Sequence, residues 1–194
     1  KVAGDIDTYD YCTLAQLKEM ESAGWDMITH GYYAHNTFAN RAALLADVAD
    51  NRDYVRANFN GRGWMHYVFP GGIVSSANDS IGVIAEAGMQ SGRLVEFNPQ
   101  PTHTLLGIDK PLQLWSRDLS QTTGYTAALT LIDRAIATGS TARIHGHRVK
   151  TTVADANNEL SVADWKSLVD GIRDRVRDGL IDNCTMSGWA AGAL

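Results

Sequence analysis

The sequence repeats one local pattern along most of its length. A helical stripe of apolar residues ends at a glycine, a short apolar run follows, and a polar loop comes after that run. The pattern occurs at Gly24, Gly63, Gly88, Gly139 and Gly179. Strands that alternate with helices pair in parallel and are joined by crossovers. Repetition of this unit predicts an α/β fold, either a barrel or a doubly wound sheet, with the functional loops at the carboxyl ends of the strands.

Periodicity and capping residues define the expected elements. Thr13 and Gln16 form a capping-box pattern before a helix that ends at Gly24. Further helices are predicted over 41–59, 80–87 and 161–179, and around an apolar stripe from 128 to 136. Strands are predicted over 25–29, 64–69, 89–95, 112–119, 141–146 and 180–186. Residues 98–110 and 147–160 are predicted to be loops, and the longer irregular loops of compact domains tend to be functional.

Composition and charge limit the classes of protein to consider. A chain of 194 residues with a net charge of −5 predicts a single globular domain over 1–194 and argues against nucleic-acid binding. No apolar run is long enough to span a membrane. Cys12 and Cys184 lie near opposite ends of the sequence, which is compatible with either a disulfide or two separate thiols.

Histidines follow two of the predicted strands. His30 and His35 stand in the polar loop after 25–29, five residues apart. This spacing does not place them on one face of a helix, so they have to converge through loop geometry. Zinc binds imidazole readily, and a catalytic zinc site needs only three protein ligands. With Pro70, Asp118 and His147, which also end strands, these histidines are predicted to share one rim of the fold.

Several of these segments resemble the polysaccharide deacetylases of carbohydrate esterase family four. The helix from Leu14, ending in Ala23-Gly24 and leading to His30, is similar to the segment that carries the metal-binding histidines of that family, although the family spaces them four apart. Three later motifs follow in the family's order, and the resemblance spans 13–187: Val68-Phe69-Pro70-Gly71-Gly72, Leu114-Trp115-Ser116-Arg117-Asp118-Leu119 and Arg143-Ile144-His145-Gly146-His147-Arg148-Val149.

The resemblance implies a fold and a set of roles. The fold is a distorted, incomplete (β/α) barrel of about seven parallel strands. His30 and His35 bind a divalent metal, with zinc preferred, and Asp118 tunes a general-acid histidine. That histidine is His147 when the motif is aligned on its ending, and His145 when it is counted from Gly139-Ser140. The implied substrate-binding residues are Phe69, Pro70, Gly71 and Trp115.

The predicted activity is removal of N- or O-linked acetyl groups from a polysaccharide or oligosaccharide outside the cell or at its surface. The family opens with a strand that ends in an Asp-Asp pair, and this sequence has no such segment. We therefore expect a preceding segment or another chain to supply a metal ligand and a base and to cover the open edge. The alternative is a non-catalytic carbohydrate-binding or structural domain. A serine hydrolase is disfavoured because the sequence contains no Gly-x-Ser-x-Gly.

Overall fold

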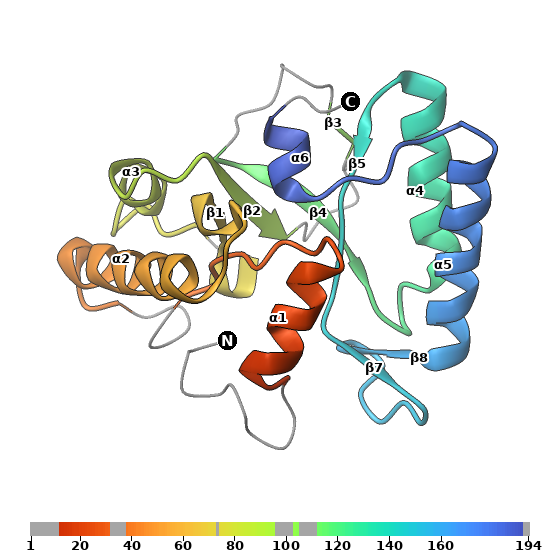
Figure 1. Ribbon diagram of the computed structural model, residues 1–194, viewed down its shortest axis with the longest axis horizontal. Helices are drawn as coiled ribbons and strands as arrows, with labels where there is room; N and C mark the ends of the chain where they lie inside the picture. The colour runs from red at the N-terminus through yellow and green to blue at the C-terminus, as the bar shows by residue number, and fades with distance from the viewer. Residues whose placement is uncertain (1–11, 32–37, 73, 96–102, 105–111, 192–194) are drawn as a thin grey trace. The chain divides into compact units, whose positions relative to one another are not determined.

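The computed structural model describes residues 12–31, 38–72, 74–95, 103–104 and 112–191 (Figure 1). The chain forms two compact units, each assembled from segments that are distant in the sequence. The first comprises Lys1–Leu94, Lys110–Leu114 and Cys184–Leu194, and the second comprises Val95–Asp109 and Trp115–Asn183. The prediction of a single domain over 1–194 stays a prediction.

Each helix of the first unit begins at a residue whose side chain caps it. They are α1 (Leu14–Ser22), α2 (Arg41–Asn58), α3 (Ser80–Glu86) and α6 (Met186–Ala190). Thr13 and Gln16 form the reciprocal capping box that the sequence predicts. The side chain of Asn40 accepts a hydrogen bond from the amide of Ala43 and so starts α2. Each cap satisfies an amide that the helix itself leaves without a partner.

Short parallel strands form the centre of the first unit. Strand β1 (His66–Val68) pairs in parallel with β2 (Ser91–Val95), and the one-turn 3₁₀ helices η2 (Gly63–Met65) and η3 (Pro70–Gly72) flank β1. The predicted strand over 25–29 is represented only by a bridge between Thr29 and Tyr67. Helices α2 and α3 pack on these strands around an apolar core that consists of Leu44, Val48, Tyr67, Phe69, Val83, Ile84, Ala87, Met89 and Leu94.

Gly63 is required by the close approach of two backbone segments in this unit. A Cβ atom at this position would fall well inside van der Waals contact with the carbonyl group of Met27. We expect Gly63→Ala to lower the free energy of unfolding by about 3 kcal/mol, because backbone cannot move aside as a side chain can. Urea denaturation followed by fluorescence measures the change.

Gly61→Ala is the matched control for this substitution. The nearest atom to a Cβ at Gly61 is Glu21 Oε1 at 3.1 Å, the end of a flexible side chain. Equal unfolding midpoints for the two variants would contradict the close approach of Gly63 to Met27.

Two long helices lie side by side in the second unit: α4 (Tyr125–Thr138) and α5 (Val162–Arg177) (Figure 1). Gly139 ends α4 in a left-handed conformation, with φ 61°, as its glycine predicts. Gly171 allows the close packing, because a Cβ atom there would lie 2.9 Å from the side chain of Leu129. Arg175 of α5 clamps Asp133 of α4 with two hydrogen bonds of 2.8 and 2.9 Å.

Strand pairing in the second unit departs from the prediction in two respects. Strand β4 (Leu114–Leu119) pairs in parallel with β6 (Ile144–Gly146), and β7 (Arg148–Lys150) pairs in parallel with β8 (Glu159–Ser161). Strand β7 and the first two residues of β8 fall in the predicted loop over 147–160. Strand β3 (His103–Thr104) pairs with β5 (Thr141–Ala142) in antiparallel fashion, so the predicted strand over 141–146 is divided between two partners.

The predicted strand over 180–186 is wrong. The described backbone from 180 to 185 makes no strand, and Thr185 caps helix α6 by accepting a hydrogen bond from the amide of Gly188. The amide of Ser187 donates to Asp26 Oδ2 at 2.7 Å. A capping threonine and a carboxylate acceptor favour the helix that begins at Met186. The residues before it, 180–185, pair with no strand among the described residues.

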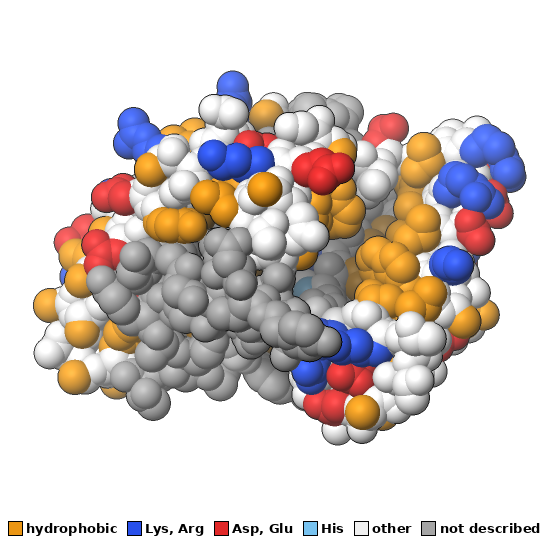
Figure 2. Space-filling model, turned by 60° about the horizontal axis from the view of Figure 1, so that its bottom comes forward, with side chains coloured by type: hydrophobic (Ala, Val, Ile, Leu, Met, Phe, Trp, Pro, Cys, Tyr) orange, Lys and Arg blue, Asp and Glu red, His pale blue; other side chains and the backbone are white. Residues whose placement is uncertain are grey.

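The surface agrees with a chain of mixed charge. On the face drawn in Figure 2, basic side chains lie among acidic ones. Among the described helices, none combines the length and the apolar character that crossing a bilayer demands. Cys12 and Cys184, whose pairing the sequence left open, are both exposed and are not joined by a disulfide.

Candidate active site

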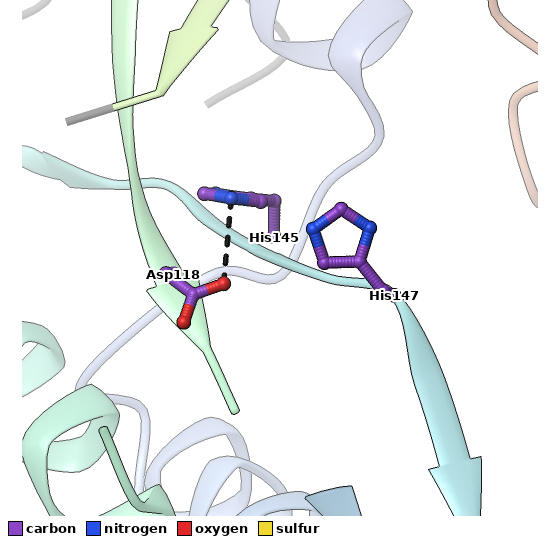
Figure 3. Close-up of side chains that lie close together, drawn as sticks. All are labelled: Asp118, His145 and His147. Atoms are coloured by element: carbon purple, nitrogen blue, oxygen red, sulfur yellow. Dashed lines mark ion pairs between the residues drawn. The ribbon is translucent and has the colours of Figure 1, made fainter. Parts of the chain in front are cut away.

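A carboxylate and two imidazoles meet at the ends of β4 and β6 (Figure 3). The parallel register places Asp118 opposite His145, and His147 follows β6 by one residue. One ligand atom from each side chain lies within 4.8 Å of the others. We call Asp118, His145 and His147 the strand-end cluster.

The two imidazoles of the strand-end cluster have different surroundings. The side chain of His145 is 8% exposed, and its Nε2 lies 3.6 Å from Asp118 Oδ1. This distance is too long for a direct hydrogen bond. The His147 side chain is exposed, and its ring stands nearly perpendicular to that of His145, with centroids 6.0 Å apart. An outside molecule can therefore reach His147 more easily than His145.

Hydroxyl groups of neighbouring residues contact the side chains of His145 and Asp118. Ser116 Oγ lies 3.0 Å from His145 Nδ1, and Thr123 Oγ1 donates to Asp118 Oδ2 at 3.1 Å. Ser120 Oγ in turn contacts Thr123 Oγ1 at 3.2 Å. Both oxygens of the carboxylate are thus assigned a direction, with Oδ2 toward Thr123 and Oδ1 toward His145.

The segment that follows His147 is fixed by a buried carboxylate. Glu159 Oε2 accepts hydrogen bonds from the amides of Asp155 and Ala154, at 3.0 and 2.7 Å. Its Oε1 lies 3.6 Å from Arg148 Nε. The pKa of Glu159 is held below its usual value by these two amides, chiefly that of Asp155, and by the guanidinium of Arg148. Arg148, the neighbour of His147, lies opposite Glu159 in the parallel pairing of β7 with β8, and this pairing orders the backbone next to His147.

His30 lies in the first unit. Its amide donates to Asn51 Oδ1, and its ring Nδ1 lies 2.9 Å from the carbonyl oxygen of Val68. A carbonyl can only accept, so the ring proton is on Nδ1, and a metal ion would be bound through Nε2. Histidines that ligate metals commonly use the other ring nitrogen in this way. His35, the predicted second ligand, lies outside the described residues.

Comparison with known proteins gives a result at the level of structure only. No family model matches the sequence, and no curated protein matches it significantly. The structure is similar to that of a protein from Mycobacterium smegmatis assigned to the polysaccharide deacetylases, with a TM-score of 0.53 and 12% identity. The alignment covers 92% of this chain and 66% of that protein, so this chain spans just under two thirds of its length.

This chain has the polysaccharide deacetylase fold. The fold class predicted from the sequence, an α/β fold of the incomplete-barrel type, is therefore confirmed. A de-N-acetylase from Aggregatibacter actinomycetemcomitans is also matched, with a TM-score of 0.35, 16% identity, and coverage of 55% of this chain and 47% of that one. A score of this size does not define a shared fold.

The predicted substrate-binding residues differ in how far they are exposed. Phe69 is 3% exposed and belongs to the core, and with Pro70 it lines a small, mainly apolar cavity of the first unit. Gly71 is exposed with φ 62°, and the amide of Gly72 donates to the carbonyl of Phe69 at 2.8 Å. The amide of Gly72 is therefore hydrogen-bonded within the turn itself. Trp115, in the second unit, is 46% exposed.

The structure joins some of the predicted site residues and leaves others untested. It brings Asp118 together with both candidate general acids, His145 and His147. The prediction that His30, His35, Pro70, Asp118 and His147 share one rim stays a prediction. Ser116 and Thr123 were not predicted as site residues. The only signal for Ser116 is its spacing of two from Asp118, which places both on one face of β4.

Proposed function

We propose that this protein is a metal-dependent hydrolase that removes N- or O-linked acetyl groups from a polysaccharide or oligosaccharide. The observation that carries the proposal is the strand-end cluster, an acid–base constellation at the carboxyl ends of two parallel strands. It occurs in a chain with the polysaccharide deacetylase fold, whose functional loops are expected at these strand ends.

In the proposed reaction, His147 protonates the departing amine, or the departing alcohol of an ester. Its exposure supports this role, because a proton donor has to reach the substrate. His145 and Asp118 are positioning residues: Ser116 holds the His145 ring at Nδ1, and Asp118 Oδ1 lies 3.6 Å from its Nε2. Transfer of a proton from His147 to the leaving group allows the tetrahedral intermediate to collapse to acetate and a free sugar amine or hydroxyl.

The proposed metal, with zinc preferred, belongs to His30 and His35. The fit of His30 is supported by its Nδ1 bond to the Val68 carbonyl, which gives the tautomer that binds a metal through Nε2. When bound, such an ion polarises an acetyl carbonyl and lowers the pKa of water. Asn51 fixes the backbone of His30, so the position of the imidazole is set by a buried residue of α2.

The proposed substrate is an acetylated glycan, and the proposed location is outside the cell or at its surface, as the resemblance to polysaccharide deacetylases implies. The exposed indole of Trp115 lies on β4, three residues before Asp118 and therefore on the opposite face of that strand. An exposed aromatic ring offers an apolar face on which a sugar ring can stack. Phe69, Pro70 and Gly71 of the first unit are proposed as further substrate-binding residues, as the same resemblance implies.

Acetate release tests the proposal directly. The chain, and the full polypeptide that its gene encodes, are incubated with Zn²⁺ and with either acetylated chitooligosaccharide or acetylated xylan, and acetate is measured by proton NMR. We expect acetate from one of the two, which also distinguishes an amide from an ester substrate. Binding of these glycans without acetate release from either polypeptide would instead support a non-catalytic carbohydrate-binding domain.

A further inference from the structure

We propose that Asp118, His145 and His147 form a binding site for a divalent transition-metal ion, Zn²⁺ in particular, separate from the site proposed at His30. Under the proposed function, on which this consequence rests, an ion at the strand-end cluster occupies the groups that have to carry protons. Zn²⁺ beyond the amount needed at His30 would therefore inhibit the hydrolase.

The donor atoms of the cluster suit zinc. Two imidazole nitrogens and one carboxylate oxygen are a known three-ligand set for this ion, and the fourth position remains for water. Nitrogen and oxygen donors of this kind bind first-row transition ions better than Ca²⁺ or Mg²⁺, which prefer oxygen alone. The ligand type therefore selects the class of ion.

The spacing of the donors also suits a shared ion. Bonds of the usual Zn–N and Zn–O lengths place neighbouring ligands of a tetrahedral site about 3.4 Å apart. His145 Nε2 and Asp118 Oδ1 are 3.6 Å apart, too far for a direct hydrogen bond and close to this value. The widest separation in the cluster, at most 4.8 Å, requires a shift of about 1.4 Å to reach the same geometry. His147 is exposed and can supply that shift by rotating its side chain.

The ligands are oriented by groups that do not themselves contact the proposed ion. Ser116 Oγ lies 3.0 Å from His145 Nδ1, on the far side of the ring from Asp118. Thr123 Oγ1 occupies Asp118 Oδ2 and leaves Oδ1 directed at His145. Such outer contacts fix ring orientation and ligand direction in metal sites. A surface ion pair without such contacts would leave the imidazole ring and the carboxylate free to rotate.

Calorimetric titration with ZnCl₂ tests the site without any measurement of activity. The His30→Gln variant serves as the background, because it weakens the first site. We expect one equivalent of Zn²⁺ to bind in this background. Adding either Asp118→Asn or His147→Gln is expected to raise the Kd by at least about tenfold. His147 is exposed, so its substitution tests the site even if Asp118→Asn impairs folding.

Asp170→Asn is the matched control, since Asp170 is an exposed carboxylate of the second unit whose partner is Arg173. It is expected to leave the Kd unchanged. Absence of Zn²⁺ binding at millimolar concentration, or binding that neither Asp118→Asn nor His147→Gln weakens, would overturn the proposed site. Where acetate release is detectable, excess Zn²⁺ is expected to slow it, and faster release would overturn the inhibitory role. Failure of the proposed function appears differently, as Zn²⁺ binding without any acetate release.

Discussion

Substitution of His147 by glutamine is expected to lower kcat/KM for acetate release by about 10²- to 10⁴-fold, the usual contribution of a positioned general acid. Glutamine keeps the size and polarity of the side chain but cannot transfer a proton at neutral pH. His147 is exposed, so the substitution should leave the fold intact. We expect the loss to fall on kcat, with little change in KM, because the proton is transferred in the transition state. Steady-state kinetics on the substrate identified by acetate release measures both values.

His145→Gln distinguishes the two imidazoles. His145 is almost fully buried between Ser116 and Asp118, so we expect its loss to have a smaller effect on kcat and to shift the alkaline limb of the pH profile, where a general acid loses its proton. A merely structural role would not move that limb. If His145→Gln abolishes activity and His147→Gln retains it, the roles are reversed and His145 is the proton donor.

The helices were predictable because their signals are local. Thr13, Asn40 and Ser161 each lie at a predicted helix start, and each accepts a hydrogen bond from an amide of the first helical turn. Gly139 ends α4 through a left-handed conformation that glycine adopts without strain. These interactions connect residues no more than four apart, so the sequence itself contains both partners.

The strands were less predictable because their partners lie elsewhere in the chain. Strand β7 is short and polar, with Arg148 and Lys150 at its ends, and it forms because β8 lies beside it. Leu180 begins a run that looks like a strand, yet it is 53% exposed and has no strand to pair with among the described residues. Apolar content alone does not reveal whether a partner strand is available.

The candidate site shows the same distinction. Asp118, His145 and His147 could be proposed as site residues because each stands near the end of a predicted strand. Their convergence depends on the register that sets Asp118 opposite His145, and a shift of one residue would turn these side chains to opposite faces. The sequence gives no direct measure of this register, and therefore none of the hydroxyl contacts from Ser116 and Thr123.

Removal of bound metal is expected to lower acetate release by at least about 10³-fold, because Lewis-acid catalysis contributes several kcal/mol to hydrolysis of this kind. Dialysis against a chelator followed by one equivalent of Zn²⁺ should restore the activity of the unmodified protein. His30→Gln should lose activity by a similar factor and should not recover at one equivalent. The Nδ1 bond to Val68 positions His30 to bind an ion through Nε2, whereas the side-chain nitrogen of glutamine is an amide that only donates hydrogen bonds.

Glu86→Gln is the control for this substitution, because Glu86 is an exposed residue of the first unit paired with Arg41. We expect this variant to bind Zn²⁺ and to release acetate as the unmodified protein does. Acetate release that survives chelation would contradict metal dependence itself. Release that is lost on chelation but unaffected by His30→Gln would remove His30 from the metal site.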